Sequence, residues 1–413
     1  MRSIYAGTLA TLGLLACSAQ APERDAEPSA SPTALPSSAS PTPEPSSSAS
    51  PTPEPSSAPS PTPEPSPNAV PVPAGVDDPR LACVRRHSAP PALVPVVRAL
   101  CAELVDHEGV SASVAVAVGE RLVWSAAEGP RCRGQAEPLR PTTALGIGSV
   151  TKLLTAVLAL EVADPRGQSL DDPLALPGFS PSLTLRGLLT HTAGLRDPEP
   201  EALLAAGDDW PRVLAEQRAA PGAHAYANAS FLLVGRWLEQ TTGRTFADLH
   251  AHEPALGPLR ERVSLSLSPS TPVACGHRWS DGWQAIDPAD VPPLPAWTLA
   301  AGGGIASVED LARLPAALAR TGRLPAMIGA RIPSDRPGWD YGLGVRVRGE
   351  GDDLVLAHSG NTGTYWAEVQ WSPATGVAVA VMSTTPQPLV ATLHAAFRAG
   401  QSTASPPSAA PPR

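Results

Sequence analysis

The stretch Gly146-Ile147-Gly148-Ser149-Val150-Thr151-Lys152 stands directly before an apolar run over residues 153–162. The run predicts a buried helix, and a serine at its start with a lysine three residues later places both side chains on one helical face. A lysine ammonium beside the hydroxyl lowers the hydroxyl pKa, whereas a lysine held neutral by burial can take the serine proton. We therefore take Ser149 as a candidate nucleophile and Lys152 as its catalytic partner. The same spacing also fits a plain helix-capping serine followed by a solvated lysine.

The elements on either side of this helix predict a discontinuous domain. Strand patterns at the two ends of the globular part enclose a middle, residues 151–318, that is mainly helical. Because terminal strands of this kind can pair with each other, we expect an α/β chain of the α+β type. It would have a discontinuous antiparallel β-sheet flanked by helices, plus an inserted all-helical subdomain and a cleft between the two parts. A helix that starts at residue 308 is expected to end or kink at Pro315. The terminal elements are helices over 95–107 and 389–398 and strands over 113–118, 121–124, 341–347, 354–357, 364–371 and 377–382.

A second motif, Tyr226-Ala227-Asn228, stands before an apolar helix predicted over residues 231–238. A tyrosine hydroxyl pressed against a lysine ammonium ionises well below its usual pKa of about 10 and can then act as a general base. An asparagine side chain can hydrogen-bond a substrate amide. Tyr226 is therefore the third candidate catalytic residue, and Asn228 is a candidate substrate-binding residue. A core tyrosine before an asparagine helix cap is the alternative interpretation.

A third motif, Ala357-His358-Ser359-Gly360-Asn361-Thr362-Gly363, falls at the end of one predicted strand and before another. Gly360 lets a substrate backbone lie close to the strand edge. The Asn361 amide is expected to pair with the Ser149 amide as an oxyanion hole, with His358 facing the cleft. These three residues are candidate substrate-binding residues, although a lone histidine is more often a satisfied core or surface residue.

The order Ser-x-x-Lys, Tyr-x-Asn, His-x-Gly, each in a fitting structural setting, is far rarer than any of its members. With it, the globular part resembles the beta-lactamase-related serine hydrolases, which include class C beta-lactamases, D-alanyl-D-alanine carboxypeptidases, D-amino-acid peptidases and esterases. Residues 188–195 and 301–307 add two landmarks of that family, and we take His191 in the first of them as structural. The resemblance covers residues 90–400 and implies the beta-lactamase or penicillin-binding-protein-like transpeptidase fold.

The resemblance also implies a reaction: a Ser149 acyl-enzyme formed on peptides ending in D-amino acids or on small esters, with water as the final acceptor. One departure stands out, because His358-Ser359-Gly360 replaces the Lys-Thr-Gly of beta-lactamases and many carboxypeptidases. It removes a cation used with substrate carboxylates, which weakens a beta-lactamase assignment, and it is familiar among the peptidase and esterase branches. The rival is a catalytically silent protein that binds a wall fragment or a partner protein in its cleft. Retention of four polar side chains, those of Ser149, Lys152, Tyr226 and His358, counts against it.

The two ends of the chain predict export and anchoring. Arg2 and an apolar run that ends in Leu14-Leu15-Ala16-Cys17 resemble a bacterial lipoprotein signal over residues 1–16, which would leave Cys17 as a lipidated first residue; an ordinary signal peptide is the alternative. Residues 17–79 are rich in Pro, Ser and Glu and predict a disordered linker. We then expect the serine hydrolase domain over residues 80–400 and a disordered tail over 401–413. The location would be the cell envelope, facing the periplasm or exterior, where peptidoglycan stem peptides are the natural substrate.

Charge and cysteine content indicate which partners, disulfides and metal sites to expect. The formal charge of −9 without basic clusters argues against nucleic acid. Four cysteines, an even number in a chain of exported type, predict two disulfides with three possible connectivities. We favour Cys83 with Cys101 by proximity and Cys132 with Cys275 by elimination. Their spacing is not that of a zinc site, and His250 and His252 on one helix would point apart. We expect no metal, no cofactor, and a monomer that meets the membrane through its lipid anchor.

Overall fold

The computed structural model of the protein describes residues 79–106, 111–179, 183–216, 220–265, 272–280, 282–290 and 293–404. The expected signal segment 1–16, the lipidation site Cys17 and the linker up to residue 78 lie outside the described residues. The same holds for the tail from residue 405 onward. Within the described residues no helix is both long enough and apolar enough to cross a membrane.

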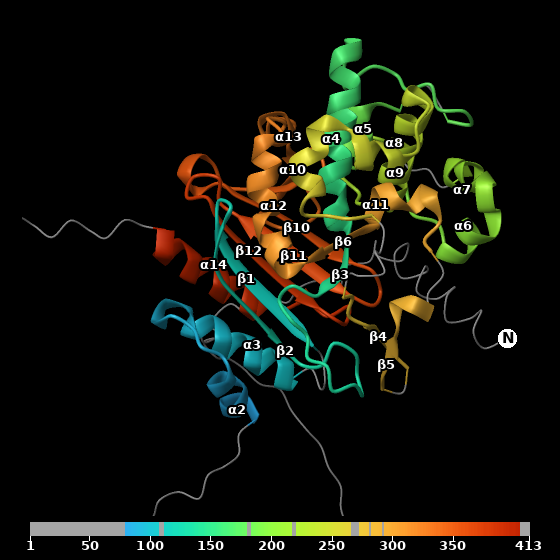
Figure 1. Ribbon diagram of the computed structural model, residues 1–413. Coiled ribbons are helices and arrows are strands. Elements are labelled where there is room, and N and C mark those ends of the chain that lie inside the picture. Colours follow the sequence, from blue (N-terminus) through green and yellow to red (C-terminus); the bar gives the residue numbers. More distant parts are fainter. Residues whose placement is uncertain are drawn as a thin grey trace, which may run out of the picture. The chain divides into compact units, whose positions relative to one another are not determined.

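The main sheet joins strands from both ends of the globular part, as expected from the strand patterns (Figure 1). The N-terminal strand β1 pairs antiparallel with the C-terminal strand β12, with Val114 opposite Val381. Every other neighbouring pair in this sheet is also antiparallel. The discontinuous antiparallel sheet predicted from the sequence is therefore confirmed. In spatial order its strands are β2 (Arg121–Glu128), β1 (Ala112–Val118), β12 (Val377–Ser383), β11 (Trp366–Trp371), β10 (Val355–Asn361), β9 (Arg346–Arg348), β8 (Asp340–Tyr341) and β7 (Ile332–Pro333).

Helices cover both faces of this sheet because its strands carry small or branched apolar residues on both sides. Along β1, Val114 and Val116 pack into a core shared with α3 (Val94–Asp106) and α14 (Val390–Ala404). The alternate residues Ala115 and Ala117 belong to the larger core on the opposite face, to which α12 (Val308–Arg320) also contributes. Figure 1 shows α3 and α14 on one side of the sheet and α12 on the other. The helix α14 continues to Ala404, beyond the boundary at residue 400 that the composition indicated.

The inserted middle is mainly helical, as predicted, but the expectation that it is all-helical is wrong, because it also carries strands. The pair β3 (Ala144–Gly148) and β6 (Gly304–Ser307) bridges its two ends, and β4 (Gly276–Trp279) pairs with β5 (Trp283–Ile286). The main helices of the larger core are α4 (Lys152–Ala163), α8 (Asn228–Thr242) and α12 (Val308–Arg320). The shorter helices are α2 (Pro79–Arg86), α5 (Leu185–Leu189), α6 (Pro200–Ala206), α7 (Trp210–Glu216), α9 (Phe246–His252), α10 (Gly257–Arg260), α11 (Leu299–Gly302) and α13 (Leu324–Gly329).

At two places the structure differs from the local pattern. The helix α12 does not end at Pro315, one of the two outcomes expected there, but runs through it to Arg320. Burial of the apolar stripe that includes Leu311 and Leu318 offsets the cost of a mid-helix proline, about 3 kcal/mol. The single strand expected over residues 341–347 is instead a turn between β8 and β9, closed by a hydrogen bond from the Gly342 amide to the Val345 carbonyl.

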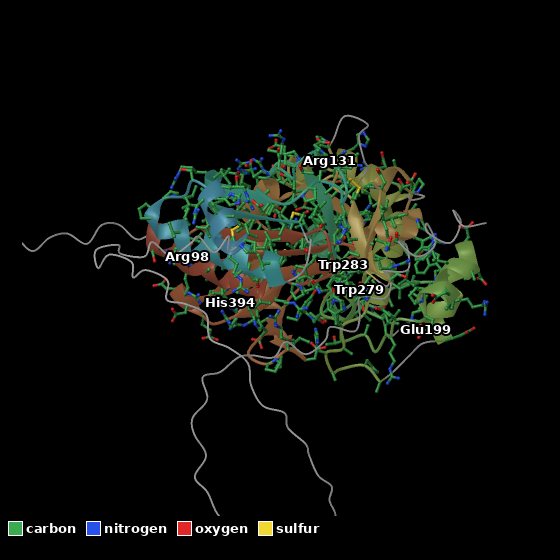
Figure 2. All side chains as sticks on the ribbon, turned by 90° about the horizontal axis from the view of Figure 1, so that it is seen from below. Arg98, Arg131, Glu199, Trp279, Trp283 and His394 are labelled. Carbon is green, nitrogen blue, oxygen red and sulfur yellow. A yellow bond between two sulfur atoms is a disulfide. The ribbon has the colours of Figure 1, made fainter. Side chains whose placement is uncertain are left out.

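Both disulfides connect as favoured from the sequence. Cys83 on α2 is bonded to Cys101 on α3, and Cys132 after β2 is bonded to Cys275 directly before β4. The second bond fastens the base of the β4–β5 hairpin. At the tip of this hairpin Trp279 and Trp283 are cross-strand partners with ring centroids 5.4 Å apart, and Figure 2 shows them side by side. An aromatic pair of this kind stabilises an otherwise isolated hairpin.

Candidate active site

Ser149 lies on a sharp turn between β3 and α4. Gly148 precedes it with φ of 48°, a left-handed conformation that favours glycine, and Ser149 then opens the single 3-10 turn that leads into α4. The Thr151 hydroxyl donates to the Gly148 carbonyl at 2.6 Å and accepts from the Gly304 amide at 2.9 Å, so the turn is fastened to β6. Ser149 keeps 7% exposure at this position, which leaves its hydroxyl at the edge of the core.

Lys152 joins three of the sequence motifs at one nitrogen. Its side chain is fully buried, and Nζ donates to Ser149 Oγ, Asn228 Oδ1 and the Ala301 carbonyl, each at 2.8 Å. A protonated lysine has three donors, so these acceptors match the ammonium form. The motifs around Ser149, Asn228 and residues 301–307 therefore meet at this lysine, as expected for a single site.

A buried carboxylate supports this cation from behind. Asp197 accepts hydrogen bonds from the Asn228 amide at 2.9 Å, from Asn228 Nδ2 at 3.2 Å and from the Ala229 amide at 2.7 Å. The bond from Nδ2 orients the Asn228 side chain so that Oδ1 faces Lys152. Burial raises the Asp197 pKa, while these hydrogen bonds and the Lys152 charge act in the opposite direction. Asp197 was not identified from the sequence, where it stands two residues after the 188–195 landmark.

Tyr226 lies beside the same lysine. The Lys152 Nζ atom is 5.2 Å from the centroid of the Tyr226 ring, and the tyrosine is partly exposed, unlike the lysine. The residue is held in an extended segment that leads into α8, whose first residue is Asn228. The structure thus brings the three residues predicted to be catalytic, Ser149, Lys152 and Tyr226, to one place.

The edge of β10 approaches the serine turn very closely. An ideal Cβ on Gly360 would lie 1.9 Å from the Ile147 carbonyl oxygen and 2.8 Å from the Ser149 amide nitrogen, so only glycine fits. A Cβ on Gly148 would likewise come within 3.0 Å of the Asn361 amide nitrogen. The backbone amides of Ser149 and Asn361 therefore belong to two segments in direct contact, the arrangement that an oxyanion hole requires.

His358 is placed differently from the expectation. Its side chain is fully buried, Nε2 lies 3.0 Å from the Tyr341 hydroxyl, and Nδ1 lies 2.8 Å from the Ser359 carbonyl. The expectation that this ring faces an open cleft is wrong, because the ring is fully buried and contacts Tyr341 of β8, two strands away in the sheet. Burial lowers the His358 pKa well below its usual range, and the charges of Arg346 and Lys152 add to this effect. The ring is therefore neutral.

Arg346 is a second buried cation near the site. It is 2% exposed, and its guanidinium carbon lies 5.8 Å from the Tyr226 ring centroid and 5.9 Å from that of Tyr341. Arg346 was not identified from the sequence because it stands inside an apolar strand pattern. An arginine inside an apolar strand pattern indicates a functional or structural role, because charged residues are rarely buried without one.

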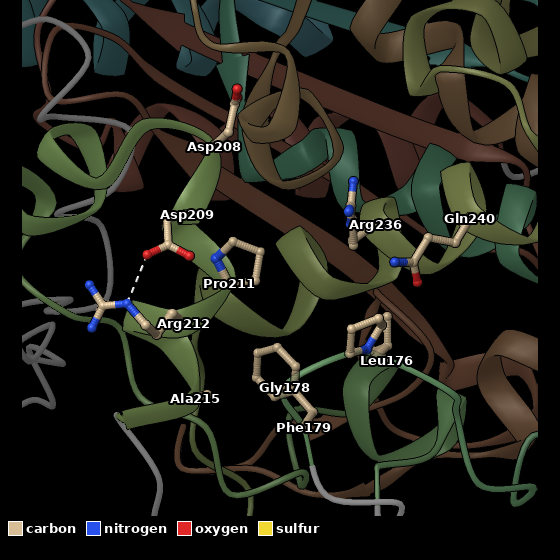
Figure 3. Close-up of a pocket in the computed structure, with 11 residues that line it drawn as sticks. Leu176, Gly178, Phe179, Asp208, Asp209, Pro211, Arg212, Ala215, Arg236 and Gln240 are labelled. Carbon is tan, nitrogen blue, oxygen red and sulfur yellow. Dashed lines mark hydrogen bonds and ion pairs between the residues drawn. The ribbon is translucent and has the colours of Figure 1, made fainter.

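A cavity and two groups of possible metal ligands lie elsewhere in the described chain, apart from the predicted catalytic residues. A cavity of about 340 Å³ in the helical part is lined by residues of the 176–179 segment and of α7 and α8, and none of the predicted site residues lines it (Figure 3). Two groups of possible metal ligands among the described residues each include two disulfide-bonded cysteines, whose sulfurs are not free thiolates. His250 is buried and His252 exposed, so these two histidines of α9 point apart, as expected.

Comparisons with known proteins agree with this geometry. The penicillin-binding protein homologue from Pyrococcus abyssi has a TM-score of 0.60 at 21% identity, over 72% of this chain and 75% of that one. The beta-lactamase/D-alanine carboxypeptidase from Pseudomonas syringae scores 0.59 at 18% identity, over 75% and 98%. SurE, which has also been solved with D-Leu, scores 0.56 at 26% identity, over 73% and 75%. The family model described as Beta-lactamase matches residues 97–402, most of the chain, so this protein belongs to the beta-lactamase family, whose members are generally serine hydrolases.

Proposed function

We propose that this protein is a serine hydrolase that forms an acyl-enzyme on Ser149, with D-amino-acid peptides of the cell wall as substrates or, failing these, small esters. The observation that carries the proposal is the 2.8 Å hydrogen bond between Lys152 Nζ and Ser149 Oγ in a buried setting. A serine beside a buried ammonium has a charge that stabilises its alkoxide, and Tyr226 beside the same ammonium would be the first acceptor of the serine proton.

The proposed reaction has two steps. Ser149 Oγ attacks the substrate carbonyl carbon while its proton passes to the Lys152 and Tyr226 pair, and the amides of Ser149 and Asn361 bind the developing oxyanion. The same proton protonates the leaving amine or alcohol as its bond to the carbonyl carbon breaks. Water then attacks the acyl-enzyme, gives a proton to the same pair, and releases the acid as Ser149 recovers its hydrogen.

Charge near the site favours an anionic substrate. Lys152 and Arg346 are both buried cations close to Tyr226, and a positive local potential attracts a carboxylate. A peptide that ends in a D-amino acid carries such a carboxylate, whereas a small neutral ester does not. The presence of D-Leu with SurE agrees with this preference. A cell-envelope location, as proposed from the chain's N-terminal sequence, would bring wall peptides within reach.

The mechanism is tested first by covalent labelling. Ser149→Ala should abolish labelling by a fluorophosphonate probe, whereas Ser402→Ala, on the distant helix α14, should label normally. Tyr226→Phe keeps the ring but removes the hydroxyl and should lower turnover by about 10²–10⁴-fold if Tyr226 is a general base. Lys152→Ala should be comparably severe. Labelling that persists in Ser149→Ala, in a folded protein, would contradict the proposed nucleophile.

The substrate class is tested with D-Ala-D-Ala peptides, p-nitrophenyl acetate and nitrocefin. We expect the peptide to be hydrolysed with the highest kcat/KM. Arg346→Met should lower kcat/KM for the peptide more than for the neutral ester, since the ester has no carboxylate. Equal losses on both substrates would argue against charge recognition, and no turnover of any of the three would favour a catalytically silent binding protein.

A further inference from the structure

We propose that His191 is a positioning residue that holds Tyr226 in its working orientation through the backbone on both sides of it and through its ring. The inference rests on the proposed function, in which Tyr226 shares the proton transfer with Lys152. It assigns a role to the 188–195 landmark, whose histidine the sequence analysis took as merely structural.

The first observation is a pair of hydrogen bonds that enclose Tyr226. The Ala225 amide donates to the His191 carbonyl at 2.9 Å, and the Ala227 amide donates to His191 Nδ1 at 3.2 Å. One histidine therefore holds the backbone amides of the two residues that flank the tyrosine. Because Ala227 is also the residue before α8, the same contact sets where Asn228 begins the helix.

The second observation is the ring contact. The imidazole of His191 lies 4.2 Å from the Tyr226 ring, centroid to centroid, at an interplanar angle of 36°. On its other sides the imidazole meets Tyr341 at 4.9 Å and Phe231 at 5.3 Å. The His191 ring therefore lies between the core and Tyr226, and its contact with the Tyr226 ring restricts the rotation of that ring.

The third observation is the backbone of His191 itself. Among the described residues it is the one non-glycine residue with a positive φ, at 57°. Such a conformation is uncommon for a non-glycine residue, although histidine, asparagine and aspartate adopt it more often than most, and it persists where the surroundings hold it. The left-handed turn is what allows the carbonyl and the side chain of one residue to reach both sides of Tyr226.

The protonation state of His191 suits this role. Nδ1 accepts a hydrogen bond from a backbone amide, so the ring proton must be on Nε2 and the ring must be neutral. Full burial lowers the His191 pKa well below its usual range, and the nearby Lys152 charge adds to the effect. The acceptor on Nδ1 is therefore retained at neutral and mildly acidic pH.

Two variants separate the side chain from the backbone turn. His191→Asn keeps an acceptor near the Nδ1 position and tolerates positive φ, whereas His191→Gly accepts the turn but removes both acceptor and ring. We expect His191→Gly to lower the rate of Ser149 acylation by about 10²-fold, the scale of a misplaced catalytic group, with KM little changed. His191→Asn should stay within about tenfold of the wild type. Thermal melts of both variants check that each is folded.

A double-mutant cycle with Tyr226→Phe decides between positioning and a general structural role. If His191 acts through Tyr226, adding His191→Gly to Tyr226→Phe should lower the acylation rate by less than about threefold further, whereas independent effects multiply. A full additional loss in the double variant, or equal rates for His191→Asn and His191→Gly, would overturn this inference alone. Wild-type turnover in Tyr226→Phe would instead overturn the proposed base, and the inference with it.

Discussion

Replacing Gly360 by alanine should disable the site without touching any predicted catalytic side chain. An added Cβ would lie 1.9 Å from the Ile147 carbonyl oxygen, where real contacts are not shorter than 3.0 Å, so β10 and the serine turn must separate by at least about 1.1 Å. Both nearby atoms, the Ile147 oxygen and the Ser149 nitrogen, belong to the backbone, and no side-chain rotation can relieve the clash.

The size of the effect follows from that displacement. It would pull the Asn361 amide away from the Ser149 amide and so open the proposed oxyanion hole. A shift of about 1 Å in a catalytic arrangement costs on the order of 10² in rate, similar to the loss of one oxyanion donor. Overpacking at this point should also lower the free energy of unfolding by about 1–3 kcal/mol.

The assay compares kcat and KM on p-nitrophenyl acetate with the rate of fluorophosphonate labelling at Ser149, and a urea titration gives the stability. Gly329→Ala is the matched control, because a Cβ there meets no atom within 4 Å. The control should keep wild-type kcat and stability. A folded Gly360→Ala protein with wild-type kcat would refute the claim that this backbone contact builds the oxyanion hole.

Two further predictions concern titratable groups inside the protein. Asp197→Asn removes the carboxylate behind Asn228 and Lys152 and should lower stability by about 3 kcal/mol and kcat at least about tenfold, whereas the exposed Asp209→Asn should do neither; urea titration and ester hydrolysis check this. Burial lowers the pKa of His250 from 6.5 to about 4 and also lowers the pKa values of His191 and His358 well below 6.5. Because the unfolded chain then binds more protons, stability present above pH 6.5 should be lost progressively as the pH falls towards 4. A flat unfolding free energy across that window, or a slope that His250→Gln leaves unchanged, would contradict the assignment.

Local pattern was enough to predict the parts of the site that lie close together in sequence. Ser149 and Lys152 are three residues apart at a helix start, so helical geometry alone places their side chains together, and the 2.8 Å bond agrees. The terminal strands could also be predicted from the sequence. Alternating or continuous apolar runs, such as those around Val114 and Val379, are a property of each strand by itself. The favoured disulfides were found for similar reasons of proximity and elimination.

Local pattern failed where a turn or a neighbouring element decided the outcome. Apolar character over residues 341–347 suggested one strand, yet Gly344, with φ of 72°, allows the chain to turn back between β8 and β9. Pro315 does not stop α12, because burial of the helix against the sheet outweighs the local preference.

The sequence by itself determined the family motifs, the antiparallel sheet built from both chain ends, and the adjacency of Ser149 and Lys152. Only the tertiary structure decided which distant groups complete the site. Lys152 donates hydrogen bonds to the Ala301 carbonyl, 149 residues away in the sequence, and to Asn228, 76 residues away. Packing also places His358 against Tyr341 and brings Arg346 near Tyr226. The physical reason is that periodicity specifies which face of an element is buried, whereas the partner across that face depends on how all the elements pack together.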